Sequence, residues 1–91
     1  MIIVSQNKDV IINFERVNFI KIEPDQNEFD IEINYGEDYW DVIGTYDSYE
    51  KAKEVLKEIV KEYKRVLTTF NKGNGQQRFY NIPKVYYMPE K

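Results

Sequence analysis

Residues 29–71 decide the fold, because along them the spacing of apolar side chains changes from every second residue to every third or fourth. Residues 29–35 read Phe-Asp-Ile-Glu-Ile-Asn-Tyr, and this alternation puts the apolar side chains on one face of a strand. Residues 48–71 read SYEKAKEVLKEIVKEYKRVLTTFN, with an apolar stripe at the period of a helix. The stripe consists of Ala52, Val55, Leu56, Ile59, Val60, Tyr63, Leu67 and Phe70. The sequence therefore predicts one strand followed by one long amphipathic helix.

Four further strands are predicted, three before residue 29 and one between the first strand and the helix. Their bounds are Ile2–Val4, Val10–Ile12, Val17–Ile22 and Tyr39–Tyr46. They are short runs rich in β-branched and aromatic residues, and polar turns separate them. In the last run, strict alternation places one set of side chains on a common face: Trp40, Val42, Gly44 and Tyr46. Short connections favour antiparallel neighbours. We therefore predict an α+β fold, with an antiparallel meander of about five strands packed on the one long amphipathic helix.

The helix is expected to begin at Asp47, because Asp47 and Glu50 have the N-cap and N3 spacing of a capping box. Gly73 suits the end of a helix. Residues 72–78 indicate a flexible linker from their Gly, Asn and Gln content. Residues 79–91 contain two prolines, which lack the N–H that a central strand needs. This last segment is therefore predicted to be a C-terminal extended arm or an edge strand.

The chain has 91 residues, which is enough for one hydrophobic core and too few for two. We therefore predict a single domain, with the sheet at 1–46, the helix at 47–71, the linker at 72–78 and the arm at 79–91. The first residues lack the basic segment of a signal peptide, and no apolar run approaches the roughly 18–20 residues of a membrane span. The expectation is a cytoplasmic protein with no membrane segment.

The sequence contains no cysteine and no histidine, which excludes disulfides, thiolate zinc sites and imidazole bases. Because histidine is the most frequent general acid–base group, this composition argues against an enzyme, and no cofactor or metal is expected. Residues 25–30 begin like a calcium loop, but Asp30 stands where that loop requires glycine. Asp30 and Glu32 lie on one strand face, whereas glycosidase chemistry needs carboxylates facing each other across a cleft. An enzyme that uses carboxylates or tyrosine remains an alternative, after the two functions described below.

The charges are distributed unevenly, which the net charge of -3 conceals. Residues 22–50 carry ten acidic groups and no basic one, whereas residues 51–91 carry ten basic and four acidic groups. A charge run is most often a solvated face, but an acidic sheet face with aromatic rings also suits docking on a basic protein surface. We therefore predict a non-catalytic protein-interaction module with a basic protein partner. The expected partner-binding residues are those of the acidic turn: Glu37, Asp38, Tyr39, Trp40 and Asp41.

The C-terminal arm supports a different prediction, the binding of single-stranded nucleic acid. Basic groups interleaved with aromatic rings are the ingredients of such binding. The residues concerned are Lys72, Arg78, Lys84, Tyr86 and Tyr87. The net negative charge of the chain weighs against a nucleic-acid partner. The same rings can instead fold back on the sheet edge, or pair with a second copy of the chain to form a homodimer.

The order of segments resembles a group of short uncharacterised proteins of Gram-positive bacteria and their phages. The likeness lies in Ile2–Lys8, Ile11–Phe14, Gly44–Tyr46, Ala52–Ile59 and Tyr87–Glu90. These segments span nearly the whole chain and describe a hairpin, a strand-to-helix junction, a helix and a tail. No activity is established for the group. The resemblance therefore implies a phage or mobile-element accessory protein and assigns no functional residue.

Overall fold

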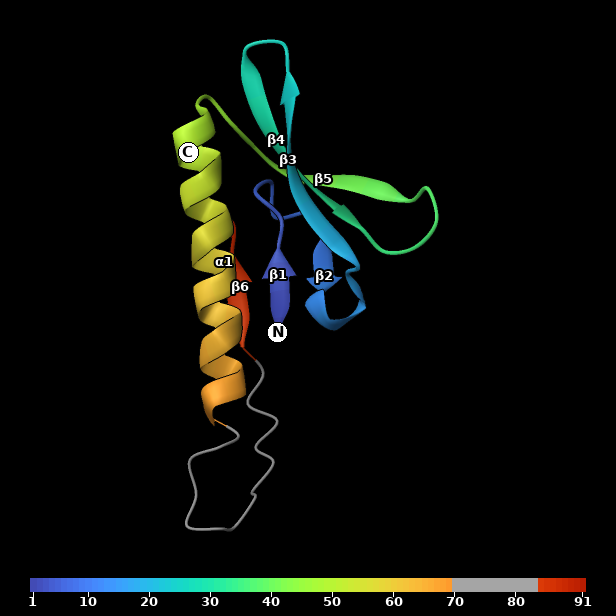
Figure 1. Ribbon diagram of the computed structural model, residues 1–91, viewed down its shortest axis with the longest axis vertical. Coiled ribbons are helices and arrows are strands. Elements are labelled where there is room, and N and C mark those ends of the chain that lie inside the picture. Colours follow the sequence, from blue (N-terminus) through green and yellow to red (C-terminus); the bar gives the residue numbers. More distant parts are fainter. Residues whose placement is uncertain (70–83) are drawn as a thin grey trace.

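The computed structural model describes residues 1–69 and 84–91, and the side chains within residues 1–64 and 84–91. In chain order the elements are β1 (Ile2–Val4), β2 (Ile11–Asn13), the 3-10 helix η1 (Phe14–Arg16), β3 (Phe19–Asp25), β4 (Glu28–Asn34), β5 (Trp40–Tyr46), α1 (Tyr49–Thr69) and β6 (Val85–Tyr87) (Figure 1). The predicted α+β class is confirmed. The predicted linker at 72–78 and the first part of the predicted arm, 79–83, lie outside the described residues.

The described strands form two three-stranded sheets, in the orders β2-β1-β6 and β3-β4-β5. The predicted antiparallel meander is therefore confirmed only for β3-β4-β5, and the prediction that all five strands belong to one sheet is wrong. The break lies at η1, between β2 and β3. There the Asn13 side chain accepts a hydrogen bond from the Glu15 N–H, and the Val17 N–H donates to the Phe14 carbonyl. This tight turn leads the chain away from β2, so that β3 pairs with β4 instead.

The C-terminal segment supplies the third strand of the first sheet. β6 lies parallel to β1. The Ile2 N–H donates to the Lys84 carbonyl at 2.8 Å, and the Met88 N–H donates to the Val4 carbonyl at 3.0 Å. The predicted edge strand is thus confirmed, and it completes the chain's own sheet.

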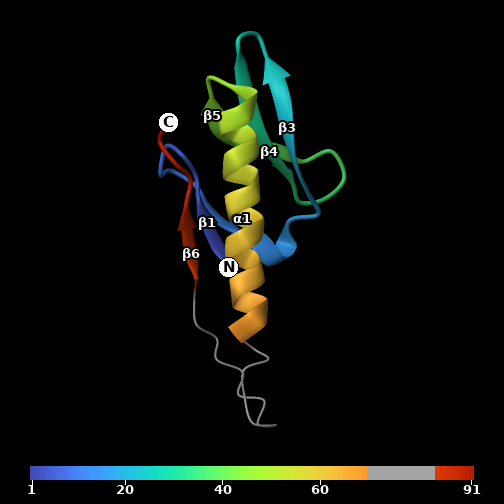
Figure 2. The ribbon, with the colours of Figure 1, turned by 60° about the vertical axis from the view of Figure 1, so that its left-hand side comes forward.

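The hydrophobic core lies between α1 and both sheets, and α1 runs along the fold in front of strands from each (Figure 2). Ala52, Val55 and Ile59 are the fully buried members of the predicted helical stripe. Leu56 is half-buried and Val60 is exposed, so the buried stripe is narrower than predicted. Two stripe residues lie outside the described side chains: Leu67 and Phe70. The sheets contribute Ile3, Ile12, Ile31, Ile33, Ile43, Tyr46 and Tyr86 to the same core, and Met88, directly after β6, adds to it.

The alternation expected in β5 is interrupted by a bulge. Ile31 of β4 lies opposite Gly44, but the next residue, Glu32, lies opposite Val42, so Ile43 is an extra residue in β5. Ile43 is 2 % exposed and Val42 is 50 % exposed. The prediction that Trp40, Val42, Gly44 and Tyr46 share one face is therefore wrong. The extra residue turns Ile43 into the core and leaves Trp40 and Val42 on the outer face, opposite to Gly44 and Tyr46.

The N-terminus of α1 is capped one residue later than the sequence suggested. The Ser48 hydroxyl accepts a hydrogen bond from the Lys51 N–H at 3.1 Å, and the Ser48 carbonyl accepts from the Ala52 N–H. Ser48 is therefore the N-cap. With Ser48 in that position, residue N3 is Lys51 and not Glu50, so the predicted capping box of Asp47 and Glu50 is not formed.

Gln6 connects the two sheets and the C-terminus. The Thr45 N–H donates to Gln6 Oε1 at 2.7 Å, and Gln6 Nε2 donates back to the Thr45 carbonyl at 3.0 Å. The Gln6 backbone N–H bonds to the Ile43 carbonyl at 2.8 Å, and Nε2 also donates to the Glu90 carbonyl. The side-chain amide thus occupies the outer edge of β5 as a paired residue of an antiparallel strand would.

Replacing Ile59 tests the packing of α1. Ile59 is fully buried, and large-to-small changes at such positions cost about 2–5 kcal/mol. Ile59→Ala should lose that amount in urea denaturation, and Ile59→Asp should abolish the folding transition because it buries a charge. Val60→Ala, on the exposed side of the same helix, should stay within about 0.5 kcal/mol of wild type. Equal losses in Ile59→Ala and Val60→Ala would contradict the observed helix face.

Replacing Gln6 tests the connection between the sheets. Gln6→Ala loses three side-chain hydrogen bonds, and at about 0.5–1.5 kcal/mol each this predicts a loss of roughly 1.5–4.5 kcal/mol. The Thr45 amide should also exchange its hydrogen faster. Gln6→Glu should be at least as destabilising, since a carboxylate cannot donate to two carbonyl groups. Asn7→Ala, at the exposed neighbouring residue, is the control, and a loss of the same size there would refute the role of Gln6.

Candidate functional site

The loop between β4 and β5 is shaped by the buried side chain of Asn34. Its Oδ1 accepts from the Gly36 N–H at 3.2 Å, and its Nδ2 donates to the Glu37 carbonyl at 3.1 Å. The Tyr39 N–H closes the turn on the Gly36 carbonyl at 2.9 Å. Glu37 takes the left-handed conformation, with φ 46, as does Gly36, with φ 135. The loop therefore has a defined conformation that presents the Glu37 and Asp38 carboxylates to solvent.

The structure places all five predicted partner-binding residues at the surface, but not on one face. Trp40 lies opposite Asn34 on the outer face of β3-β4-β5. Asp41 lies opposite Ile33, on the inner side, where it accepts a hydrogen bond from the Tyr35 hydroxyl. Asp41 therefore faces a different part of the surface from Trp40. The five predicted partner-binding residues do not form one continuous surface.

The outer face of β3-β4-β5 carries an apolar patch that the sequence only partly indicated. Cross-strand neighbours share a face, and Phe19, Asn34 and Trp40 form one such row. The next row is Lys21, Glu32 and Val42. Phe19 is 66 % exposed and Trp40 is 38 % exposed. We call Phe19, Trp40 and Val42 the outer patch. Phe19 and Lys21 were missed because strand pairing, which brings them beside Trp40, is not visible in a linear sequence.

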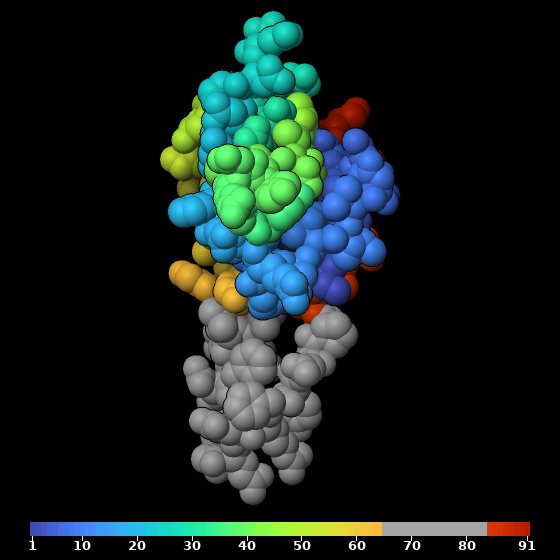
Figure 3. Space-filling model, turned by 90° about the vertical axis from the view of Figure 1, so that its right-hand side faces the viewer, coloured from blue at the N-terminus to red at the C-terminus, as the bar shows by residue number. Residues whose placement is uncertain are grey.

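A groove separates β2 from the β4–β5 loop. Figure 3 shows this loop beside the segment that contains β2 on the right-hand face of the molecule. The cavity has a volume of ≈ 330 Å³ and is lined by Val10, Ile11, Ile12, Asn13, Arg16, Val17, Tyr35 and Asp41. Ile11 is highly exposed there, and it belongs to β2, an edge strand of its sheet. The groove thus adds an apolar wall to the side of the acidic loop.

The groove is lined by one tyrosine and one carboxylate, Tyr35 and Asp41, and the two are hydrogen-bonded to each other. The hydrogen bond to the Asp41 carboxylate raises the pKa of the Tyr35 hydroxyl above its ordinary value. A tyrosine with a raised pKa keeps its proton at neutral pH, so it acts as a donor rather than as a nucleophile or base. Among residues 1–69 and 84–91, no group of three or more carboxylates is arranged to hold a metal ion.

The residues of the predicted nucleic-acid arm are not brought together. Tyr86 is 6 % exposed, and its hydroxyl donates to Glu58 at 2.8 Å, so its ring faces the core and cannot stack on a base. Lys84 forms an ion pair with Glu62 of α1. Tyr87 is exposed. The other two residues, Lys72 and Arg78, lie outside the described part of the chain.

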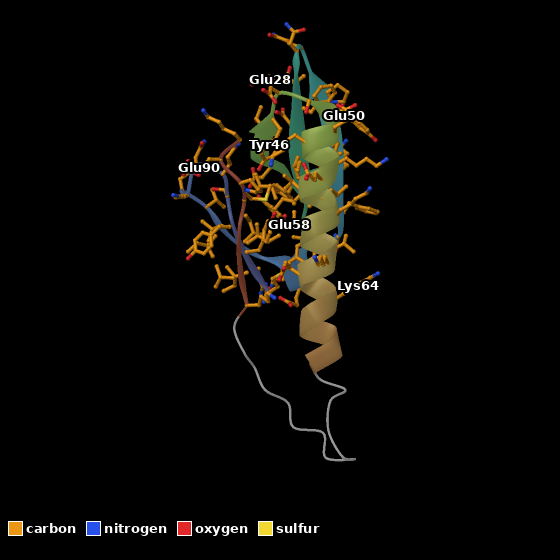
Figure 4. The ribbon with its side chains drawn as sticks, turned by 90° about the vertical axis from the view of Figure 1, so that its left-hand side faces the viewer. Glu28, Tyr46, Glu50, Glu58, Lys64 and Glu90 are labelled. Atoms are coloured by element: carbon orange, nitrogen blue, oxygen red, sulfur yellow. The ribbon has the colours of Figure 1, made fainter. Side chains whose placement is uncertain are left out.

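Two buried tyrosines hold the C-terminal segment instead. The Tyr46 hydroxyl donates to the Pro89 carbonyl at 2.7 Å. Tyr46 and Glu58 lie in the same region between α1 and β6 (Figure 4). Burial, with a smaller contribution from the Glu58 charge, raises the pKa of Tyr46 to about 12. Burial and the hydrogen bond to Glu58 raise the pKa of Tyr86 as well. The two hydroxyl groups therefore bind the C-terminal segment to β5 and to α1.

Comparisons with protein-family models, with curated proteins and with solved structures find no match to this chain. Within the described residues, α1 is too polar to be a membrane-crossing helix. The site is therefore interpreted from its own geometry and charge.

The raised pKa of Tyr46 predicts a loss of stability at alkaline pH. Below the ordinary tyrosine pKa of 10.0, both states keep the proton and the stability is complete. As the pH rises from 10 towards 12, the unfolded chain ionises first, so the free energy of unfolding falls. Tyr46→Phe should weaken this pH dependence and, because the bond to Pro89 is lost, cost about 0.5–1.5 kcal/mol at pH 7.

Urea denaturation at pH 7, 10 and 11 measures both effects. Tyr39→Phe removes one hydroxyl from an exposed position and should keep wild-type stability at pH 7. An unchanged alkaline pH dependence in Tyr46→Phe would show that the Tyr46 hydroxyl is not held as described.

Proposed function

We propose that the protein is a non-catalytic protein-interaction module that docks an acidic and aromatic surface on a basic surface of a partner protein. The observation that carries the proposal is the position of the outer patch beside the acidic β4–β5 loop. Exposed apolar groups with a polar rim are typical of protein-binding surfaces. A phage or mobile-element accessory role, which the resemblance of the sequence implies, agrees with a protein that acts by occupying a partner.

The composition of the surface supports a protein partner. Tryptophan and tyrosine supply much of the binding energy in protein interfaces because their large rings bury extensive area at small entropic cost. Trp40 and Tyr39 are both exposed next to the loop carboxylates. The central groups of the patch are apolar, and the charges of Glu37 and Asp38 lie at its edge. This arrangement matches the apolar centre and polar rim of a typical interface.

The charge of the surface supports a basic partner. Nine of the ten acidic groups of residues 22–50 lie on β3, β4, β5 or the loops that follow these strands, and only Glu50 lies on α1. A field of one sign accelerates encounter with a surface of the opposite sign and disfavours partners of the same sign. This proposal is preferred to single-strand binding by the arm, because that function needs the Tyr86 ring at the surface.

A pair of charge-reversal variants tests the proposal. The tagged protein is used to isolate partners from a bacterial lysate, and the binding constant of each purified partner is then measured by calorimetry. Reversal of the loop charges in Glu37→Lys/Asp38→Lys should weaken binding by on the order of tenfold or more. Glu50→Lys/Glu54→Lys makes the same change in net charge on α1 and should leave the affinity within about twofold.

The thermal melts of both variants should remain cooperative, because all four residues are exposed. Equal weakening by the two double variants would mean that net charge alone attracts the partner. A partner that binds both variants as tightly as wild type would remove the β4–β5 loop from the interface.

A further inference from the structure

The ring of Trp40 already holds a cation. The Lys21 ammonium lies over this ring, with Nζ 4.3 Å from the ring centroid. A cation over the face of tryptophan is attracted by the ring's quadrupole, and tryptophan is the best of the aromatic residues for this contact. Trp40 is nevertheless partly exposed. The ring therefore acts as a cation acceptor at the surface, with Lys21 as its present occupant.

Carboxylates lie close to the same position. Glu32 lies directly opposite Lys21 in the β3–β4 pairing and shares the outer face with Trp40 and Val42. Lys21 Nζ also lies 3.4 Å from Glu23 Oε2, and both side chains of that pair are about half exposed. The Lys21 ammonium thus contacts the ring and Glu23 at the same time, so it can exchange its place on the ring for the pair with Glu23 alone without a change in the backbone. Exposed pairs of this kind are weak, so such exchange has a small energetic cost.

We infer that Trp40, with Glu32 beside it, forms a subsite for an arginine side chain of the basic partner, and that Lys21 competes for this subsite from within the chain. The inference rests on the proposed function and adds the chemistry that the partner must offer. When the partner's arginine enters, its guanidinium stacks on the Trp40 ring, and the Lys21 ammonium leaves the ring and keeps its pair with Glu23. Val42 borders the subsite in the same row as Glu32 and supplies an apolar contact for the arginine stem.

The chemistry of the two cations explains why arginine displaces lysine. Guanidinium is planar and more weakly hydrated than ammonium, so it stacks on an aromatic face at a smaller desolvation cost. It also forms two parallel hydrogen bonds with a carboxylate, which a lysine cannot do. Glu32, one row from Trp40 on the same face and paired with Lys21 and Val42, supplies a carboxylate for such a pair. A partner arginine can therefore stack on the Trp40 ring and form two hydrogen bonds with the Glu32 carboxylate. The Lys21 ammonium can form only the contact with the ring and a single hydrogen bond.

Fluorescence can test the subsite without a known partner, because Trp40 is the only tryptophan of the chain. A hexa-arginine peptide is titrated into the full-length protein while the tryptophan emission is recorded. The emission should change and reach saturation. Hexa-lysine should need a higher concentration for the same change, and hexa-glutamate should produce none.

Two pairs of variants separate the subsite from general charge attraction. Lys21→Met keeps an apolar stem and removes the competing ammonium, so it should lower the half-saturating concentration of hexa-arginine by about two- to fivefold, the value of one exposed cation–π contact. Lys57→Met removes the same charge from the exposed side of α1 and should leave it unchanged. Glu32→Gln should raise the half-saturating concentration, and Glu28→Gln, at the far end of the same strand, should raise it less.

The inference is overturned if Lys21→Met and Lys57→Met shift the titration equally, or if hexa-arginine leaves the emission unchanged in both. The outcome is separable from that of the proposed function. A natural partner that is weakened by Glu37→Lys/Asp38→Lys but is insensitive to Lys21→Met would retain the docking surface and exclude the subsite.

Discussion

The two sheets are joined by a single side-chain amide, that of Gln6, which pairs with the outer edge of β5. A strand edge presents N–H and C=O groups that need partners when they are shielded from water. Gln6 provides these partners to Thr45 and Ile43, and its Nε2 also donates to the Glu90 carbonyl of the C-terminal segment. The described strands form two small sheets with no strand pairing between them. The hydrogen bonds of Gln6 hold these sheets around one core, which α1 covers.

The proposed binding surface is shaped by the same contact. Because the carbonyl of Ile43 bonds to Gln6, the bulge in β5 is fixed, and Ile43 enters the core while Val42 and Trp40 turn outward. Gly44 belongs to this arrangement, since a Cβ there would approach the Met88 Cε to 3.0 Å. Trp40 and Val42 of the outer patch are therefore exposed because the bulge turns them to the face of the sheet opposite the core.

Much of the candidate surface was accessible from the sequence, and a specific part was not. The acidic turn at 37–41 was predicted from the charge distribution, because charge is a property of composition along the chain. Phe19 and Lys21 lie far from Trp40 in sequence, and only the register of β3 on β4 brings the three side chains together. The reverse error concerns Tyr86, which looked available for stacking but has its ring in the core. A short run of aromatic residues has no periodicity that would separate buried rings from exposed ones.

By itself, the sequence determined the local structure: the positions of the strands, the long helix with its buried stripe, and an edge strand near the C-terminus. These features depend on side-chain periodicity, turn residues and prolines, all of which act over a few neighbouring residues. Only the tertiary structure decided that the strands divide into two sheets, that Ser48 caps the helix in place of Asp47, and that β5 carries a bulge. The division into two sheets and the bulge depend on which backbone and side-chain groups remain unpaired once distant segments meet, whereas the choice between Ser48 and Asp47 is made by contacts within the first turn of the helix. The hydrogen bonds from Gln6 to Thr45 and Glu90 join residues 39 and 84 positions apart, and no local pattern encodes them.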